Sequence, residues 1–547
     1  MVKTAQTSPI SIEKHYYSYA KIDFFSALVK NYHQKSTVVE PFYNLLPDPN
    51  NVPSMAAEID ATYSQNRDQL ADILVDLYQN LPPESAVQQN IDRLRHKNTY
   101  TITTGHQCNL FTGPLYMMYK ILHVIKLSDT YHANFPHLQF VPVFWLNSED
   151  HDMEELNHFY LFGQKIEGPA TWNGAMGKQN AQDLSPIIAL IDEKLGTNQH
   201  AEEVKSILHT AYEQAATHAE AQIRFLHSLF GRFGLVIIDQ SHSALKKMAR
   251  PLLHHELTHV GETARWVELQ NEALTKQNYH AQAKAQAVNL FWLEGKERLK
   301  IEVENDKWTI ATKEKQFSLT EMQHLAASQP ENFSFNVISR PLYQQWVLPN
   351  MVYVGGGGEI AYWLQLKQLF GAYKIFFPAL QLRQSVLWVD KYAFQKMEKL
   401  NFSLNDLWTD EAHLVKNYVQ EHTHNELNLT EEKKLLQDIT EQLKQKAVQI
   451  DASLEASVLS ENARILNAFD NLEAKLIRAE KRKYEQQIQQ IQNLKQKLFP
   501  NNGLQERHDN IIEYLYLYGI SFIDCLYDAL LPFNEHFLIL CEESNVA

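Results

Sequence analysis

Apolar runs typical of buried strands alternate with amphipathic stretches over the first 390 residues of the chain. β-branched and aromatic runs predict strands at 98–104, 139–146, 234–240 and 351–354. A loop and a stretch with helical spacing follow each run, and Pro114 opens one of these predicted helices. Repeated strand–loop–helix units predict an α/β fold with a doubly wound parallel sheet.

Two regions interrupt this alternation. A polar helical pattern occupies about 164–230, and a second interruption at about 263–330 contains short antiparallel strands near 289–312. We interpret both as insertions into an α/β body that spans 1–390, although they could instead form a separate small domain. Before the first strand, helical spacing predicts one helix over 59–81, which Pro82 and Pro83 end.

The composition changes to Gln, Lys, Glu and Leu over about 432–499, within a helical domain expected at 391–505. Two apolar stripes predict an antiparallel coiled-coil hairpin, with its turn between Ser457 and Asn462. Its apolar seam favours contact with a second copy of the chain, although each arm could instead pack only on the other. The last segment, 506–547, is expected to return to the body with a strand at 536–543.

Charge and cysteine content narrow the classes of function. The 547 residues carry a formal net charge of −15, which disfavours a nucleic-acid partner because phosphate binding relies on clustered Lys and Arg. Three cysteines without a CxxC pair fit a reducing compartment, so the cytoplasm is the expected location, and they give no zinc signature. No apolar run reaches the roughly 18 residues of a membrane span, so we expect no membrane partner.

The first segment with candidate chemistry is TTGHQCNLFTGPLYMMYK at 103–120. Ligands of open α/β sheets bind at the carboxyl ends of strands, which makes this loop a candidate binding site. Its candidate ligand contacts are Thr104, Gly105, His106, Gln107 and Gly113. The segment is not a Walker A loop, because Lys120 follows Gly113 by seven residues and no Ser or Thr comes next. The alternative is a loop whose glycines only permit tight turns.

The second segment crowds polar groups behind the strand at 139–146. Asn147 and Glu149 are candidate binding residues, and Asp150, His151 and Asp152 are candidate catalytic residues. Carboxylates beside a histidine can supply a general base, and carboxylate oxygens could hold Mg²⁺. The alternative is an ordinary helix start, where acidic residues are favoured by the helix dipole.

The third segment, at 336–367, joins an arginine to four consecutive glycines. Glycines between a strand and a helix let a ligand approach the backbone closely, and an arginine can bind a carboxylate or phosphate through two nitrogens. The candidate binding residues here are Arg340, Gly355, Gly356, Gly358, Glu359, Tyr362 and Trp363, with Arg383 beyond them. The alternative is a sharp turn followed by aromatic side chains of the core.

Two other groups are weaker candidates. His254, His255 and His259 lack the HExxH order of a zinc protease, so we interpret them as surface or packing residues, and no metal ligands are predicted. Cys108 lies in the first loop, but no Cys/His/Asn arrangement supports a nucleophile there.

Three blocks of the sequence resemble the bacillithiol biosynthesis cysteine-adding enzymes, the BshC family. They are TTGHQCNLFTGPLY, VPVFWLNSEDHDMEELNH and SRPLYQQWVLPNMVYVGGGGEIAYWLQLK, and the resemblance extends over essentially the full length. It implies a Rossmann-like body with inserted connecting segments, a C-terminal antiparallel coiled-coil hairpin and a homodimer.

The resemblance also implies a ligase that adds L-cysteine to the amine of glucosaminyl-malate and so completes bacillithiol, a low-molecular-weight thiol. A carboxylate is a poor acyl donor, which makes ATP a candidate cofactor, with Mg²⁺ beside it. On this hypothesis the first loop and the helix at Pro114 hold nucleotide phosphates. Asp150, His151 or Asp152 accepts the proton of the amine, and Arg340 with the glycine loop holds malate carboxylates or phosphate. The competing interpretations are a non-catalytic dimeric scaffold or sugar-ligand-binding protein, and an RNA-binding synthetase relative.

Overall fold

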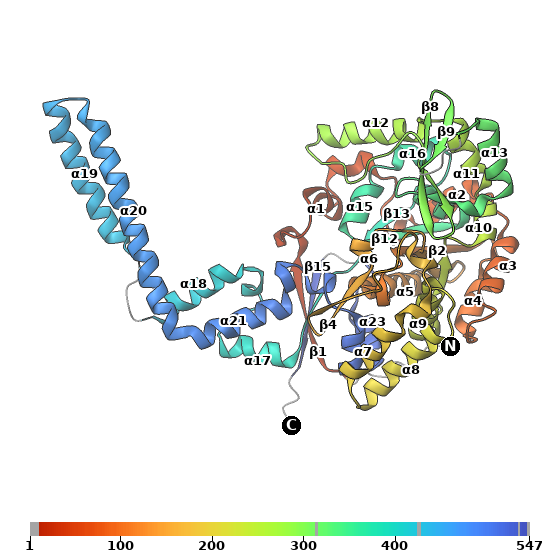
Figure 1. Cartoon of the computed structure of the whole chain (residues 1–547), viewed down its shortest axis with the longest axis horizontal. Coiled ribbons are helices and arrows are strands. Elements are labelled where there is room, and N and C mark those ends of the chain that lie inside the picture. The colour runs from red at the N-terminus through yellow and green to blue at the C-terminus, as the bar shows by residue number, and fades with distance from the viewer. Residues whose placement is uncertain (1–9, 312–315, 424–427, 534–535, 544–547) are drawn as a thin grey trace. The chain divides into compact units, whose positions relative to one another are not determined.

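The computed structural model describes residues 10–311, 316–423, 428–533 and 536–543. Two compact units make up the chain (Figure 1). The first comprises Met1–Trp388 with Leu504–Ala547, and the second is Val389–Gly503.

A five-stranded parallel sheet forms the centre of the first unit. Its order is β13 (Ala379–Leu382), β12 (Asn350–Gly355), β2 (Thr99–Gln107), β3 (Gln139–Asn147) and β6 (Val236–Asp239). The chain runs outward from β2 through β3 to β6, then returns to the other side of β2 to add β12 and β13. This confirms the doubly wound parallel sheet, and it places a topological switch point between β2 and β12. The strand β13 was not predicted from the sequence.

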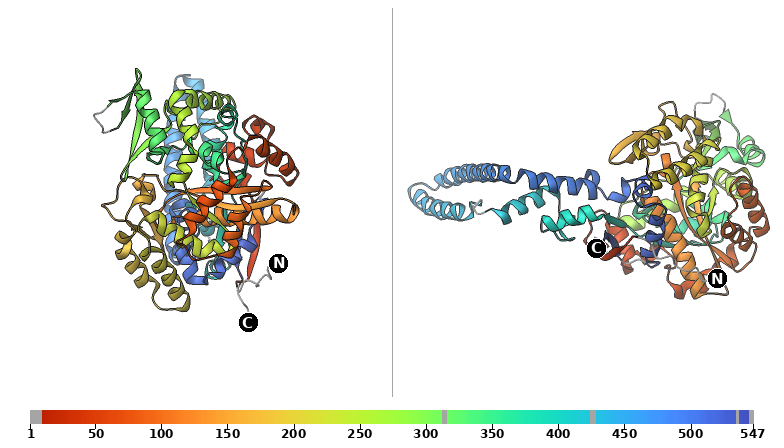
Figure 2. Two further views of the ribbon diagram at one scale, coloured as in Figure 1. Left: turned by 90° about the vertical axis from the view of Figure 1, so that its right-hand side faces the viewer. Right: turned by 90° about the horizontal axis from the view of Figure 1, so that it is seen from below.

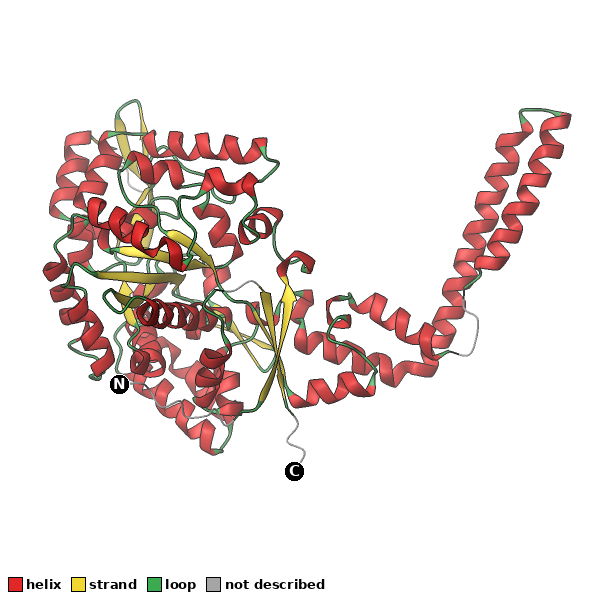
Figure 3. Ribbon diagram, turned by 180° about the vertical axis from the view of Figure 1, so that it is seen from behind, coloured by secondary structure: helices red, strands yellow, loops and turns green. Residues whose placement is uncertain are grey.

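Side chains of β3 alternate between two cores. Phe144 and Leu146 belong to the core that contains the helix α5 (Tyr116–Asn134), whereas Val143 and Trp145 belong to the core on the opposite face. Figure 3 shows helices on both faces of the strands. A strand covered on both faces needs apolar residues at successive positions, which explains the continuous apolar run in its sequence.

Further helices of this unit lie before, between and after these strands. The first part of the unit contains α1 (Ala27–His33), α2 (Val52–Thr62), α3 (Arg67–Tyr78), α4 (Ser85–Arg93) and α6 (Met153–Leu156). The region after β3 contains α7 (Ser185–Leu195), α8 (Gln199–Glu213), α9 (His218–Phe230), α10 (Ser243–Met248), α11 (Arg250–Thr258) and α12 (Glu262–Lys276). The remainder contains α13 (Leu319–Ser328), α14 (Arg340–Val347), α15 (Gly357–Trp363), α16 (Lys367–Ala372), α22 (Ile511–Tyr518) and α23 (Ser521–Ala529). No helix of the described residues is long and apolar enough to cross a membrane.

The single helix predicted over 59–81 is wrong. The helix α2 ends at Thr62, and α3 begins at Arg67 after a new cap, because Asn66 accepts a hydrogen bond from the backbone N–H of Gln69. A cap of this kind satisfies amides that a continuing helix would bond internally. The apolar residues thus keep helical spacing across the gap between α2 and α3. The break itself is set by the hydrogen bond at Asn66, which this spacing does not show.

A second sheet of five strands lies in the inserted region, and all of its pairs are antiparallel. Its order is β10 (Gln316–Phe317), β9 (Lys307–Ile310), β8 (Glu297–Glu304), β7 (Leu290–Glu294) and β11 (Phe333–Phe335). Tight turns at Gly295 and at Asn305–Asp306, where φ is positive, join its central strands. This agrees with the short antiparallel strands predicted near 289–312.

Two smaller sheets complete the unit. The strand β15 (His536–Glu542) pairs antiparallel with β1 (Ile12–Ser18) and lies beside β14 (Val386–Val389). The strand predicted at 536–543 is thereby confirmed. The hairpin of β4 (His158–Leu161) and β5 (Gln164–Glu167) follows α6.

The second unit is helical. It contains α17 (Lys391–Lys399), α18 (Glu411–His422), α19 (Thr430–Ile450), α20 (Leu454–Lys481) and α21 (Glu485–Leu498). Figure 2 shows α19 and α20, in light blue, side by side, and the Thr440 hydroxyl donates to Oδ1 of Asn462 between them at 2.8 Å.

The predicted hairpin is confirmed, but its turn is not at Ser457–Asn462. The chain reverses at 451–453, because Asp451 leaves the helical conformation and its carboxylate accepts the backbone N–H of Ser453 at 2.8 Å. This local side-chain hydrogen bond competes with the helix for the backbone groups at the turn.

Candidate active site at the carboxyl edge of the parallel sheet

All five parallel strands end at one edge, and this edge gathers most of the residues singled out in the sequence. His106 and Gln107 end β2, Asn147 ends β3, and Gly355 ends β12. Arg383 directly follows β13, and its backbone N–H donates to the Gly355 carbonyl at 2.8 Å. Three segments that are far apart in sequence thus reach one place, the place where open α/β sheets bind ligands.

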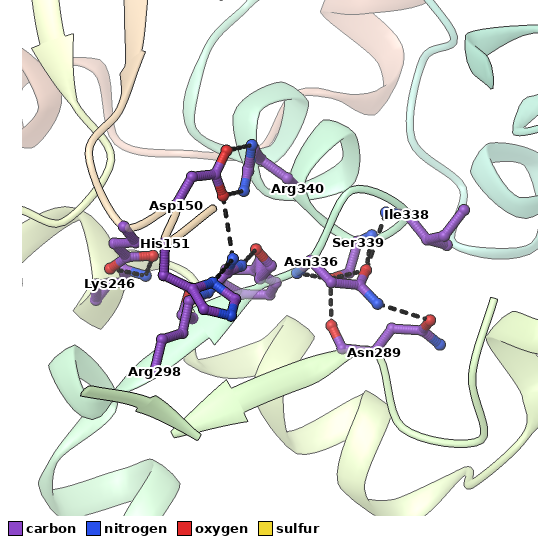
Figure 4. A network of polar contacts seen from close by, with 12 residues as sticks. Asp150, His151, Lys246, Asn289, Arg298, Asn336, Ile338, Ser339 and Arg340 are labelled. Carbon is purple, nitrogen blue, oxygen red and sulfur yellow. Dashed lines mark hydrogen bonds and ion pairs between the residues drawn. The ribbon is translucent and has the colours of Figure 1, made fainter. Parts of the chain in front are cut away.

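Asp150 is the centre of a buried charged cluster beyond β3 (Figure 4). Arg340 binds both carboxylate oxygens, with 3.0 Å from Nη1 to Oδ2, and Arg298 donates to Oδ1 at 3.1 Å. The side chains of Asp150, Arg340 and Arg298 are 10%, 13% and 6% exposed. Arg340 begins α14 and Arg298 lies on β8, so one carboxylate connects three separate segments.

The charge state of Asp150 follows from these partners. Burial by itself would raise its pKa, but Arg340 and Arg298 outweigh burial and lower the pKa below the ordinary value. The carboxylate is therefore ionised and occupied by hydrogen bonds. We conclude that Asp150 positions the two guanidinium groups and is poorly suited to accept a proton from a substrate.

His151 and Asp152 differ from Asp150 in their surroundings. The exposed His151 ring lies edge-on to Phe291, and its Nδ1 is 3.5 Å from Nη1 of Arg298. Partial burial and the Arg298 charge lower the pKa of His151, which leaves the imidazole neutral and able to accept a proton. Asp152 is exposed and caps α6 by accepting the N–H of Glu155 at 3.4 Å.

Glu149 lies inside the protein. Its carboxylate forms an ion pair with Lys246 at 2.8 Å, and Lys246 also donates to the carbonyl of Phe333 at 2.8 Å. The two side chains are 1% and 0% exposed. This pair joins the loop after β3 to α10, and Glu149 presents no face to a ligand, contrary to the binding role expected for it.

Lys120 and Glu359 span the switch point between β2 and β12. Nζ of Lys120 lies 2.9 and 2.7 Å from the two oxygens of Glu359, and it also donates to the Gly105 carbonyl. The Tyr353 hydroxyl and the Gly356 N–H donate to the same carboxylate at 2.7 and 2.8 Å. Sequence reasoning considered Lys120 only as a Walker lysine and missed this pair.

The first loop is shaped by close packing. The Thr104 hydroxyl donates to the Val354 carbonyl at 2.7 Å, which joins β2 to β12. Gly113 has a φ of +67°, and a Cβ there would lie 2.7 Å from the Cβ of Asn109, so only glycine fits. His106 is 8% exposed, and burial together with the charge of Lys120 holds its pKa well below the ordinary value.

The amino end of α5 offers little to an anion. The Leu115 N–H donates to the Asp509 carbonyl at 2.7 Å, and the Met117 N–H donates to the Pro114 carbonyl at 3.1 Å. Pro114 itself has no N–H. The structure therefore gives less support to a phosphate site at this helix start than the sequence did. The N–H groups of Leu115 and Met117 already donate to carbonyls of the protein.

Arg383 lies against the glycine loop. Its guanidinium binds Glu506 at 2.6 and 2.8 Å, and the pair is buried, with side chains 3% and 0% exposed. A Cβ added at Gly356 would lie 3.6 Å from Nε of Arg383. The open backbone of Gly356 thus leaves room for a ligand atom beside this nitrogen.

Three buried polar atoms at the edge have no hydrogen-bond partner among the described residues. They are Nε of Arg340, Nε of Arg383 and Oδ1 of Asn147. Buried polar groups are nearly always hydrogen-bonded, so each of these atoms is open to a water molecule or a ligand atom. Two cationic donors and one acceptor suit a ligand with anionic and N–H groups.

The aromatic candidates lie differently. Trp363 is 1% exposed and stacks on Tyr353 at 4.4 Å, with Phe370 and Phe377 beside it, so its ring belongs to the core. Tyr362 is partly exposed, and burial with the Glu359 charge raises its pKa. Cys108 is fully buried 3.1 Å from Oε1 of Gln222, and burial raises its thiol pKa well above the ordinary value, which is unsuitable for a nucleophile.

Protein carboxylates at this edge fit Mg²⁺ poorly. Asp150, Glu149 and Glu359 are each paired with Arg or Lys. Asp239 accepts the Ser148 hydroxyl and the N–H of Ser241. A cation that needs oxygen ligands would have to displace these partners. A nucleotide fits better, because the unpaired guanidinium nitrogens can meet phosphate.

The fold is that of a Rossmann-like α/β protein, and the edge at its switch point is a candidate small-molecule site. Residues 12–384 match the family described as "Bacillithiol biosynthesis BshC, N-terminal Rossmann-like domain", and residues 386–542 match "Bacillithiol biosynthesis BshC, C-terminal coiled-coil domain". The chain belongs to the BshC family.

Relatives match along nearly the whole chain. A protein of Flavobacterium psychrophilum is 35% identical over 526 residues, which cover 96% of this chain and 98% of the relative. A protein of Flavobacterium johnsoniae is 35% identical with the same coverage, and one of Cytophaga hutchinsonii is 33% identical over 95% of this chain and 97% of its own length. Each of the three carries the name "Putative cysteine ligase BshC".

Removing the Asp150 charge should destabilise the protein. Asp150→Asn leaves two buried guanidinium groups without a full counter-charge, so we expect a loss of about 3–5 kcal/mol in the free energy of unfolding at pH 7.5. The measurement is urea unfolding followed by tryptophan fluorescence. The control is Asp152→Asn, which keeps an N-cap residue and should stay within about 0.5 kcal/mol of wild type.

The difference in stability between wild type and Asp150→Asn should depend on pH. Because the folded pKa of Asp150 is lowered, its stabilisation is complete above the unfolded pKa of about 3.9 and is lost as the pH falls through the folded pKa. The difference between wild type and Asp150→Asn should therefore narrow at pH 3.5. Equal stability of the two proteins at pH 7.5 would contradict the role assigned to Asp150.

Proposed function

We propose that this protein is a ligase that forms an amide between the carboxyl group of L-cysteine and the amine of glucosaminyl-malate. The observation that carries the proposal is the match to cysteine ligase relatives over 96% of the chain at 35% identity. Both substrates are small and carry carboxylate and amine groups, which suits the unpaired donors and acceptor at the sheet edge. A biosynthetic reaction of this kind fits a location in the cytoplasm.

Amide formation needs an activated carboxyl group. At neutral pH the cysteine carboxylate carries a negative charge that repels an attacking amine. A bound ATP would supply the activation by transferring an adenylyl or phosphoryl group to this carboxylate, with release of pyrophosphate or ADP. The attacking amine would then displace AMP or phosphate. The residues proposed to hold the phosphates of ATP are Arg383 and Gly356, where an unpaired Nε faces the open backbone of the loop.

Arg340 is proposed to bind a substrate carboxylate. Asp150 fixes two of its guanidinium nitrogens, while Nε stays buried and unpaired among the described residues. Holding the guanidinium before the substrate arrives lowers the entropy cost of binding. Asp150 thus contributes to binding through Arg340.

His151 is proposed as the group that accepts the proton from the attacking amine. Among Asp150, His151 and Asp152, only His151 offers a neutral imidazole. This ring lies beside the Arg298–Asp150 cluster. Its exposed ring can reach a substrate without a change in the core. A positioned general base contributes about 10²–10⁴-fold to a rate.

The primary test is a reaction of purified protein with L-cysteine, glucosaminyl-malate and Mg-ATP, analysed by mass spectrometry. We expect the mass of the cysteinyl amide in the complete mixture and no product when ATP is omitted. Product in both tubes would reject ATP while keeping the ligase. No product in either tube, from protein with an intact circular dichroism spectrum, would contradict the ligase proposal.

Removing the proposed base should slow turnover without unfolding the protein. We expect His151→Ala to lower kcat by about 10²–10⁴-fold with a smaller change in KM. In wild type, the acidic limb of the kcat/KM profile should lie below the ordinary histidine pKa of about 6.5, because the pKa of His151 is lowered. The control is His254→Ala, on the exposed side of α11. An unchanged limb in His151→Ala would reject this base.

We further propose that the helical hairpin joins two copies of the chain. Leu435, Ile439 and Leu443 on α19 are 63%, 53% and 52% exposed, and Leu472 and Leu476 on α20 are 51% and 42% exposed. A row of exposed large apolar side chains along one coiled coil is typical of a surface that a second copy covers.

Light scattering after size exclusion tests the dimer. Wild type should have twice the mass of the chain, and Ile439→Glu with Leu443→Glu should have the mass of one chain. The matched control is Gln437→Glu with Gln445→Glu, which adds the same charge on roughly the opposite side of α19. A monomeric wild type would mean that the two arms pack only on each other.

A further inference from the structure

A group of metal-ligating side chains lies away from the sheet edge, where α11 gives way to α12. One ligand atom from each of His255, His259 and Glu262 lies within 4.8 Å of the other two. Nε2 of His255 is already 3.2 Å from Oε2 of Glu262. In a tetrahedral zinc site with bonds of about 2.0–2.1 Å, neighbouring ligand atoms lie about 3.3 Å apart. One pair thus has this spacing, and a ligand atom of His259 lies within 4.8 Å of both partners.

Local hydrogen bonds prepare His259 to bind a metal. Its Nδ1 lies 2.9 Å from the Thr258 hydroxyl and 3.1 Å from the His255 carbonyl. These contacts place the ring proton on Nδ1 and leave the lone pair on Nε2, which has no partner within the described part of the chain. A second hydrogen bond of this type fixes the tautomer and orientation of histidines that bind metals.

The rings also restrict where the ligand atoms can point. The His255 ring stacks on His259 with centroids 4.2 Å apart, and its other neighbour is the Tyr373 ring at 4.5 Å. His255 and Glu262 are about one-third exposed, and His259 is exposed, so an ion can enter from solvent. The three side chains are therefore accessible to an ion and to water from the solvent side.

A buried network supports the turn that carries these ligands. Glu256, next to His255, accepts the hydroxyl of Thr263, next to Glu262, at 2.6 Å. The same carboxylate accepts the backbone N–H and the side-chain amide of Asn289 at 2.7 and 3.0 Å. Figure 4 shows Asn289 bound in turn to Asn336 and Ser339, beside Arg340. Glu256 is thus a support for the turn, with its oxygens already used.

The turn itself brings the ligands together. Gly261 has a φ of +80° and donates its N–H to the Ala287 carbonyl at 2.9 Å, so that α12 can begin immediately at Glu262. The spacing His-x₃-His-x₂-Glu places two ligands at the end of one helix and the third at the start of the next. Sequence reasoning missed this set, because only the reversal at Gly261 returns Glu262 to the histidines.

We propose that His255, His259 and Glu262 bind one divalent transition-metal ion, Zn²⁺ by preference, which fastens the end of α11 to the start of α12. Two imidazoles and a carboxylate form a borderline donor set that suits zinc better than Mg²⁺ or Ca²⁺, which prefer oxygen ligands alone. This site is separate from the proposed ligase chemistry and does not depend on it.

Zinc binding to the full-length protein tests the proposal. Metal-free protein is titrated with Zn²⁺ in competition with a chromogenic zinc indicator. We expect wild type to bind one more equivalent than His255→Ala or His259→Ala, and Glu262→Gln to weaken that equivalent at least about tenfold. The matched control is His254→Ala, a neighbouring histidine outside the group, which should bind zinc like wild type.

A second measurement separates this site from other surface histidines. Added Zn²⁺ should raise the thermal unfolding midpoint of wild type and of His254→Ala, because a ligand of the folded state stabilises it, whereas His259→Ala should show no rise. Co²⁺ in place of Zn²⁺ should give visible absorption bands that His259→Ala loses. Equal stoichiometry and equal thermal shifts in wild type and His259→Ala would overturn the proposal.

Discussion

The ion pair between Asp150 and Arg340, with Arg298 as a second partner, is the interaction on which the candidate site depends. It joins the loop after β3, the start of α14 and the inserted strand β8 through one buried carboxylate. Burying the Arg340 and Arg298 side chains without a counter-charge would cost free energy, and so would burying the Asp150 carboxylate alone. The three segments can therefore be buried only together, which gives the edge of the sheet a defined shape before any substrate arrives.

The same principle recurs across the edge. Lys246 neutralises Glu149, Lys120 neutralises Glu359, and Glu506 neutralises Arg383, each pair joining segments distant in sequence. Most of the charged side chains at this edge therefore form ion pairs that hold its segments together, and few of them are free to take part in catalysis. What remains for a ligand is a small set of atoms, the unpaired nitrogens of Arg340 and Arg383 and the amide oxygen of Asn147. Such a preorganised set suits electrostatic recognition of carboxylate and phosphate groups.

Some elements of the fold could be predicted from local sequence patterns, and others could not. Strands β2, β3, β6 and β12 were predictable, because burial on both faces demands continuous apolar runs. The short strand β13 was not, since four residues at Ala379–Leu382 carry little pattern. The break between α2 and α3 and the turn after Ile450 were also missed. Each depends on one backbone N–H that donates to a side chain, to Asn66 in the first case and to Asp451 in the second, and the spacing of apolar residues does not show such a bond.

By itself the sequence determined the class of fold, the helical hairpin and the three segments that meet at the sheet edge. The fold class and the hairpin follow from the spacing of apolar residues, and the three segments follow from their positions at the ends of predicted strands. Only the tertiary structure decided the roles of the residues within those segments. Asp150 and Glu149 are neighbours with similar side chains, yet one binds two arginines at the edge and the other a lysine inside the protein. Their partners come from β8, α10 and α14, and only chain folding brings those elements to them. The physical reason is that a carboxylate takes its pKa and its function from the charges and the solvent around it, which the order of residues along the chain does not specify.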